Sequence, residues 1–202
     1  MSLVFILLII SYLLGSIPTS YIMGKLVRNI DIREHGSGNV GATNSLRVLG
    51  TKIGIFTLII DVAKGALAVL FAKLIIEQPS NLLLVFSGLL AIIGHIFTIF
   101  LKFKGGKGVA TSAGVFLILT PLATGITLLI FVITVWISKY VSLGSLLAAL
   151  TLFIVELIIN INNHFADIEL LIFILIIAIF IFIRHKANIS RLLDGNENKL
   201  KF

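Results

Sequence analysis

The sequence has no cysteine and few charged residues, which make up 12% of its 202 positions. Without cysteine, disulfides, thiolate nucleophiles and thiolate metal sites are excluded. The low charge accompanies 58% hydrophobic residues and a mean hydropathy of +1.16. A soluble domain of this length cannot bury so much apolar surface, so the composition excludes a soluble fold. We therefore predict an all-α integral membrane protein, with residues 1–202 forming a single domain.

Acidic residues are scarce as well: nine Asp and Glu stand against 16 Lys and Arg, for a net charge of +7. In a soluble protein such a balance would suggest a nucleic-acid partner. Here most basic residues flank apolar runs, and cytoplasmic loops of membrane proteins collect Lys and Arg. We therefore expect the lipid bilayer as a partner and no nucleic acid, and no obligatory protein partner is evident.

Motifs for metals and organic cofactors are also lacking. The four histidines show none of the spacings of paired metal ligands, and no Gly-x-Ser-x-Gly elbow occurs. Gly36-x-Gly38-x-x-Gly41 matches the dinucleotide fingerprint in its letters, but an apolar span precedes it where a strand is required. We expect no metal and no cofactor.

The apolar runs predict seven transmembrane helices, with the N-terminus outside and the C-terminus in the cytoplasm. The run over residues 109–137 is long for one crossing and short for two, and the charges decide between these options. Splitting it near Pro121 places every Lys and Arg in the cytoplasm except Lys64 and Lys73. The predicted spans are residues 3–24, 53–76, 83–101, the two parts of 109–137, 142–160 and 168–184.

The first span is expected to be a retained helix, because its start has no basic region and no small-residue cleavage site before Tyr12. Pro18 should kink this span, and neighbouring hydroxyl groups can pair the carbonyls that the kink frees.

Residues 102–112, KFKGGKGVATS, combine three lysines, three glycines and two hydroxyls between apolar spans. A glycine-rich turn entering a helix leaves backbone N–H groups aimed at one point, and lysines add positive charge there. Glycine also lets the backbone approach a ligand closely. The pattern therefore predicts a phosphate-binding loop. The alternative is a basic loop that only orients the protein, but orientation by charge requires no glycine.

The first polar loop, residues 35–47, is rich in hydrogen-bond donors. Arg47 offers a planar fork suited to phosphate, and nearby amides can hold the hydroxyls of a polyol. A turn with helix caps is the alternative, and it applies most directly to Asn44 and Ser45.

Two further pairs of polar residues lie at predicted cytoplasmic helix ends. Ser142 and Ser145 share one helix face and are placed to reach an anion at the start of the helix. The alternative is ordinary capping or close packing of small residues, which would be preferred if the other polar loops were absent. His185 and Asn188 also face together, at the membrane surface. A single histidine in that place is usually structural or an interface anchor.

Ionisable residues also occur inside the predicted spans. Asp61 and Lys64 lie three positions apart in the second span, which predicts an intramembrane ion pair. Glu156, in the sixth span, has no obvious partner in the sequence.

Three motifs, taken together, resemble the bacterial acyl-phosphate:glycerol-3-phosphate acyltransferases, the PlsY family. They are Gly36–Asn44, Gly94–Thr111 and Arg184–Asn188, and the match extends in order over nearly the whole chain. One departure is Thr98, where the family usually has proline. The resemblance implies a seven-helix bundle and a place in the bacterial cytoplasmic (inner) membrane, with the active site at the cytoplasmic face. It also implies acyl phosphate and glycerol 3-phosphate as substrates, and lysophosphatidic acid and inorganic phosphate as products.

The resemblance also implies roles for individual residues. It assigns residues 104–108 to phosphate binding, Ser37 and Arg47 to essential positions, and Ser142, His185 and Asn188 to the site or its support. The expected catalytic residues are Ser37, Arg47, Lys104, Ser142, His185 and Asn188. The expected substrate- and phosphate-binding residues are Gly38, Asn39, Thr43, Asn44, Gly105, Gly106, Lys107, Gly108, Thr111 and Ser145.

The chain lacks the His-x-x-x-x-Asp motif of other glycerolipid acyltransferases. Our hypothesis is that a phosphate oxygen of a bound substrate takes the proton of the attacking hydroxyl, with His185 in support. The competing class is a binding or transport protein for a phosphorylated solute. A transporter should have polar groups at mid-membrane and pseudo-symmetric halves, whereas here the donors are predicted to gather at one membrane face.

Overall fold

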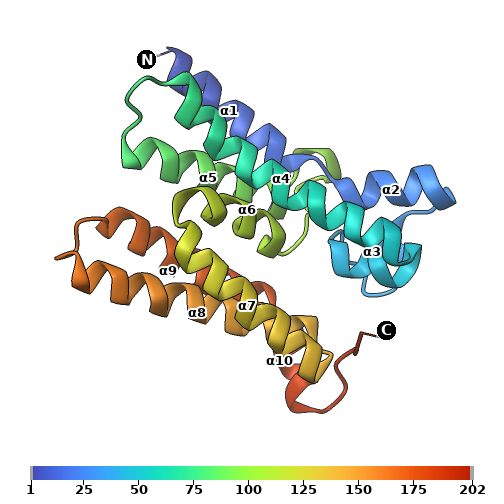
Figure 1. Cartoon of the computed structure of the whole chain (residues 1–202). Helices are drawn as coiled ribbons and strands as arrows, with labels where there is room; N and C mark the ends of the chain where they lie inside the picture. The colour runs from blue at the N-terminus through green and yellow to red at the C-terminus, as the bar shows by residue number, and fades with distance from the viewer. Residues whose placement is uncertain (1, 201–202) are drawn as a thin grey trace. The chain divides into compact units, whose positions relative to one another are not determined.

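The computed structural model describes residues 2–200, and every regular element in that part of the chain is helical (Figure 1). The chain divides into two compact units, Met1–Leu119 (unit 1) and Thr120–Phe202 (unit 2). The prediction of a single domain over residues 1–202 stays a prediction.

Unit 1 consists of six α-helices and two short 3-10 helices in the described part of the chain, and α4 is the longest of them. Its elements are α1 (Ser2–Ser16), α2 (Thr19–Arg28), η1 (Ile32–Glu34), α3 (Ala42–Leu49), α4 (Thr51–Ile75), α5 (Asn81–Ile96), η2 (Ile99–Leu101) and α6 (Val109–Leu119). Helix α1 packs on α5, and α4 packs on α6, α3 and α5 (Figure 1). Gly65 lies against the Thr111 backbone and Gly114 against the Val62 backbone, so α4 and α6 pack with their main chains in close approach.

The predicted kink at Pro18 is confirmed: α1 ends at Ser16, α2 begins at Thr19, and the two helices are bent by 42°. Groups from distant segments pair the carbonyls at this break, where we expected local hydroxyls. Thr98 Oγ1 donates to Ser16 O at 2.5 Å and Lys64 Nζ donates to Ile17 O at 2.8 Å. The break is therefore held by tertiary contacts.

Unit 2 contains α7 (Pro121–Ser138), α8 (Val141–Asn162), α9 (Ile168–Arg184) and α10 (Lys186–Leu193). Helix α8 packs against both α7 and α9, and α10 bends away from α9 by 59°. The predicted break near Pro121 is confirmed, because α6 ends at Leu119 and α7 begins at Pro121, a favourable first helical position for proline. Thr120 Oγ1 and Asn160 Nδ2 donate to the Glu156 carboxylate at 2.7 and 3.3 Å, so Glu156 has partners that the sequence did not indicate.

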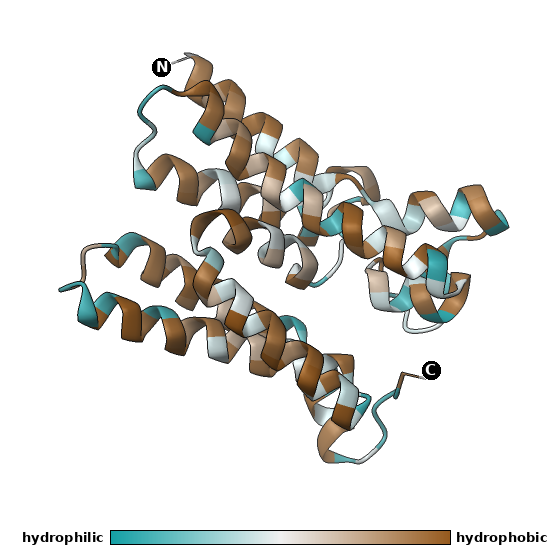
Figure 2. Ribbon diagram, viewed as in Figure 1, coloured by the Kyte–Doolittle hydropathy of each residue, from teal (hydrophilic) through white to brown (hydrophobic). Residues whose placement is uncertain are grey.

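Four helical segments are long and apolar enough to cross a membrane: α4, α5 with η2, α7 and α8. The number becomes six if the bent pairs α1–α2 and α9–α10 each count as one span, and α6 is a shorter apolar helix. Hydrophobic residues line the helices and polar residues gather near their ends (Figure 2). The integral membrane character fits the prediction, while the count of seven and the orientation stay predictions.

Candidate functional site

The lysine–glycine loop, residues 102–108, is fastened to the C-terminal end of α5. The Gly105 N–H donates to Ile96 O at 2.9 Å, and the Gly106 N–H donates to His95 O at 3.0 Å. These bonds continue the pairing of α5 beyond its last turn and leave the loop lying across the helix end. The N–H groups that the sequence offered to phosphate at these two positions are therefore used within the protein.

Contact with α5 also explains why glycine is needed in the loop. A Cβ at Gly105 would overlap the His95 carbonyl oxygen, and a Cβ at Gly106 would overlap His95 Nε2. Gly108 has a φ of +87°, a left-handed conformation that favours glycine. Close packing and backbone conformation thus account for the three glycines before any ligand is considered.

The lysine side chains of the loop and the first N–H groups of the helix that follows it, α6, are suited to phosphate binding. The side chain of Lys104 is exposed and Lys107 is half-buried, and α6 begins directly after the loop at Val109. The first N–H groups of a helix precede any carbonyl partner within that helix, and they favour anions. Thr111 is fully buried in the α4–α6 contact, so its backbone packing against Gly65 is the role that the structure supports.

Asn44 organises the first polar loop from within. Its Oδ1 accepts the Ser37 N–H at 2.9 Å, and its Nδ2 donates to His35 O at 3.0 Å and Ile32 O at 3.3 Å. Both amide hydrogens are used in this way, so Asn44 has none left for a substrate hydroxyl. The alternative of a turn-forming role is the one that the geometry supports for Asn44.

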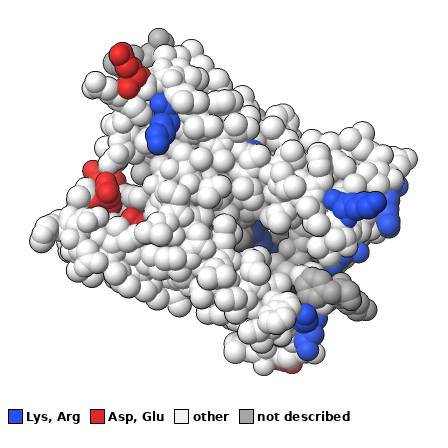
Figure 3. Space-filling model, viewed as in Figure 1, with Lys and Arg blue, Asp and Glu red and all other residues white. Residues whose placement is uncertain are grey.

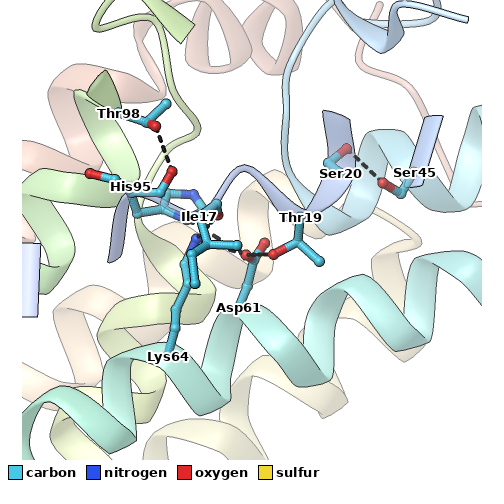
Figure 4. Close-up of polar contacts among 9 residues, drawn as sticks. Ile17, Thr19, Ser20, Ser45, Asp61, Lys64, His95 and Thr98 are labelled. Atoms are coloured by element: carbon cyan, nitrogen blue, oxygen red, sulfur yellow. Dashed lines mark hydrogen bonds and ion pairs between the residues drawn. The ribbon is translucent and has the colours of Figure 1, made fainter. Parts of the chain in front are cut away.

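The other predicted residues of this loop lie nearer the surface. Ser37 and Gly38 are exposed, while Asn39, Thr43 and Arg47 are half-buried. The Ser45 hydroxyl lies 2.6 Å from the Ser20 hydroxyl and ties α3 to α2 (Figure 4). Ser45 therefore supports the helix that carries Arg47.

The two loops of unit 1 share one hydrophobic cluster. Leu101, just before the lysine–glycine loop, is buried together with Val40, inside the first polar loop, and with Ile32 and Leu49, on either side of it. Arg47 and Lys104 therefore project from segments fixed to a common core. That their side chains bind substrate phosphate stays a prediction.

Basic side chains gather over the end of unit 1 that carries α2 and α3 (Figure 3). One of them, Arg33, is already paired, because its guanidinium donates to Asp31 and lies 5.2 Å from the Tyr21 ring centre. The hydrogen bond from Arg33 lowers the pKa of Asp31 to about 2, and Asp31 raises the pKa of Arg33. The charge of Arg33 is thus balanced locally.

Unit 2 brings Ser142 and Asn188 together on a third residue that the sequence analysis missed. The buried Glu197 accepts hydrogen bonds from Ser142 Oγ at 3.1 Å, Asn188 Nδ2 at 2.8 Å and Arg191 Nε at 2.8 Å. Burial raises the pKa of Glu197, but the hydrogen bonds from Asn188, Arg191 and Ser142 outweigh it, and the pKa is lowered overall. Asn188 and Arg191, three apart on a short helix, were the available signal that an anion lies between them.

The two other predicted residues of unit 2 bond to their own helices. His185 is buried and its Nδ1 lies 2.8 Å from Ile181 O, so Nδ1 carries the hydrogen in this contact and a neutral ring has Nε2 as acceptor. Ser145 Oγ donates to Val141 O at 2.9 Å, which fits the helix-packing alternative. That the segments of both units share one pocket stays a prediction.

Comparison with known proteins decides the family. A sequence model described as Glycerol-3-phosphate acyltransferase matches residues 5–195. The chain belongs to this glycerol-3-phosphate acyltransferase family. The resemblance drawn from its motifs is confirmed, and the chain is placed among acyltransferases and not among transport proteins.

Curated relatives support the glycerol-3-phosphate acyltransferase assignment over the full length. The protein of that name from Fusobacterium nucleatum is 47% identical over 201 residues, covering 98% of each chain. The one from Bacillus subtilis is 43% identical over 200 residues, covering 99% of each.

The fold of this glycerol-3-phosphate acyltransferase family member also matches solved structures. The crystal structure of PlsY (YgiH), an integral membrane glycerol 3-phosphate acyltransferase, is similar in its glycerol 3-phosphate form with a TM-score of 0.87 and 36% identity, covering 98% of this chain and 96% of that one. Its lysophosphatidic acid form gives a TM-score of 0.85 at the same identity, covering 98% of this chain and 95% of that one.

Proposed function

We propose that this protein transfers a fatty acyl group from acyl phosphate to glycerol 3-phosphate, giving lysophosphatidic acid and inorganic phosphate. The observation that carries the proposal is the placement of Arg47 on α3 and of Lys104 in the lysine–glycine loop, two segments fixed to the one hydrophobic cluster that contains Ile32 and Leu101. Two cationic side chains on one support are suited to a reaction between two phosphate-bearing molecules. Membership of the glycerol-3-phosphate acyltransferase family supports the acceptor, and the donor is our inference.

The proposed reaction requires neutralisation of the negative charge on the leaving phosphate more than activation of the carbonyl carbon. An acyl phosphate is a mixed anhydride, so its carbonyl carbon is already electrophilic and phosphate is a competent leaving group. Lysine and arginine side chains and the first N–H groups of α6 would stabilise the negative charge that grows on the departing phosphate. We assign this role to Lys104, Lys107 and Arg47, with Ser37, Gly38, Asn39 and Thr43 completing the first polar loop.

A phosphate oxygen serves as the base in this proposal. A hydroxyl oxygen of glycerol 3-phosphate attacks the carbonyl carbon, its proton passes to a substrate phosphate oxygen, and the carbon–oxygen bond to the leaving phosphate breaks. Ser142 donates its hydrogen to Glu197, so its oxygen can accept a hydrogen bond from the second hydroxyl of glycerol 3-phosphate, the one that does not attack. Asn188 is held by the same carboxylate, and both residues are thereby oriented before substrate binds.

The reaction would take place at the cytoplasmic face of a bacterial inner membrane, where the fatty chain can stay between helices in the bilayer. The product is a precursor of membrane phospholipids, which makes this a first step of phospholipid synthesis. No cofactor or metal takes part in the proposal.

The purified full-length protein in lipid nanodiscs tests the proposal. It is incubated with labelled glycerol 3-phosphate and one of three acyl donors: acyl phosphate, the thioester of the fatty acid with coenzyme A, or the thioester of the fatty acid with acyl-carrier protein. We expect lysophosphatidic acid with acyl phosphate alone, together with one inorganic phosphate for each product molecule. A comparable rate with either thioester would overturn the proposed donor, and no product with any donor would overturn the reaction.

A further inference from the structure

A cluster of buried charged and polar side chains contains Asp61, Lys64, Thr19 and His95 (Figure 4). Asp61 and Lys64 on α4 form the predicted ion pair, with 3.0 Å between Nζ and Oδ1, and both are at most 4% exposed. Thr19 Oγ1 donates to the same carboxylate oxygen at 3.1 Å. His95 Nδ1 lies 3.8 Å from that oxygen, within ion-pair range but beyond hydrogen-bond length.

His95 connects this cluster to the loop. Its carbonyl oxygen accepts the Gly106 N–H at 3.0 Å, and its ring lies so close to Gly106 that a Cβ there would overlap Nε2. One edge of the imidazole thus faces the Asp61 carboxylate and the other faces the loop backbone. Any rotation of the ring would move an atom into Gly106 or away from Asp61.

We propose that Asp61 and His95 are positioning residues for phosphate binding: the carboxylate holds the imidazole ring, and the ring holds the lysine–glycine loop in its binding conformation. This inference rests on the proposed function for the loop's role. A carboxylate facing Nδ1 favours the tautomer that carries hydrogen there, and its attraction is strong where water is excluded. Neither residue needs to touch the substrate.

Lys64 extends the same arrangement to the α1–α2 break. It neutralises Asp61 and also donates to Ile17 O at 2.8 Å. The alternative is that Asp61 and Lys64 serve only as a structural ion pair. The two roles separate in a charge-free double variant, because removing one partner of a buried pair is strongly destabilising whereas removing both is often tolerated.

The test compares the variants Asp61→Asn, Lys64→Met, Asp61→Asn with Lys64→Met, and His95→Gln, all in the full-length protein in nanodiscs. Glu156→Gln is the matched control, because it changes a buried membrane carboxylate of unit 2. Thermal unfolding reports the fold, and amide hydrogen exchange of residues 104–108 reports the loop.

We expect the double variant to recover the stability lost in the single variants, while its loop amides exchange about tenfold faster than in the wild type. His95→Gln, which leaves the ion pair intact, should show the same faster loop exchange, and Glu156→Gln should show none. Wild-type loop exchange in the double variant or in His95→Gln would overturn the proposal, and His95→Gln carries the test if the double variant does not fold.

Steady-state kinetics add a second readout. Lys104→Ala identifies which of the two substrates, acyl phosphate or glycerol 3-phosphate, depends on the loop, because it raises that substrate's KM. The double variant should raise the same KM by at least about tenfold, while its kcat stays within about threefold of the wild-type value. A fall in kcat with unchanged KM would overturn the positioning role. If wild-type protein forms no product but the loop exchange changes as expected, the proposed function fails and the positioning of the loop stands.

Discussion

Asn44 and Glu197, the second of which was not predicted, each form hydrogen bonds to predicted site residues. The Asn44 side chain accepts the Ser37 N–H and donates to the carbonyl oxygens of Ile32 and His35. Glu197 accepts hydrogen bonds from Ser142, Asn188 and Arg191. A buried group whose partner is removed costs more free energy than the hydrogen bond itself contributed. Substitutions at these two positions are therefore expected to act on stability first.

Replacing Glu197 with glutamine should destabilise the protein by about 1.5–3 kcal/mol, because charged hydrogen bonds to Asn188, Arg191 and Ser142 are weakened. The measurement is thermal or denaturant unfolding at pH 7. The pKa of Glu197 is lowered in the folded protein, so its stabilisation is present above the pKa of an unfolded glutamate and is lost as pH falls through the folded value. A difference between wild type and variant that stays constant down to pH 3 would contradict this origin.

Arg47→Ala and Lys104→Ala should each lower kcat/KM by at least about a hundredfold, because a charge facing phosphate is lost. His185→Gln should retain substantial turnover, because in our hypothesis a substrate phosphate takes the proton. Turnover assays with acyl phosphate, accompanied by unfolding curves, provide the measurement. Complete inactivity of a folded His185→Gln protein would favour a histidine base instead.

At the scale of elements, the seating of the lysine–glycine loop on α5 is the feature most sensitive to added volume. Gly106→Ala should raise the KM of at least one phosphate substrate by about ten- to a hundredfold, because the new methyl group overlaps His95 Nε2 and displaces the loop. Gly125→Ala on α7 is the matched control, since a Cβ there meets nothing within 4 Å. Equal kinetics for the two variants would show that the loop tolerates displacement.

Two short helices were not anticipated from the sequence. Residues 42–49 and 186–193 lie in polar segments that the hydropathy pattern assigned to loops or span ends, yet they form α3 and α10. Isolated helices of eight residues are marginal, so their stability comes from packing, which for α3 is against α4. These two helices carry Arg47 and Asn188, so their formation positions two residues of the candidate site.

For the whole molecule, the predicted orientation can be checked directly, because the natural chain has no cysteine. Single variants Gln78→Cys and Asn163→Cys should react with an impermeant maleimide on intact cells, and Glu34→Cys only after permeabilisation. All three positions are exposed. The reverse pattern would show that the basic loops face outward, against the charge rule that predicts the topology.

The sequence by itself determined the membrane environment, most helix positions, the breaks at Pro18 and Pro121, the Asp61–Lys64 pair and the family. These features depend on local composition, on spacing along one helix, or on motifs that stay contiguous in the chain. The tertiary structure alone decided that Gly105 and Gly106 donate to α5, that Thr98 and Lys64 pair the carbonyls at the first break, and that Glu197 joins Ser142 to Asn188. Each of those contacts joins groups separated along the chain, and a donor in a sequence does not reveal which acceptor folding will bring to it.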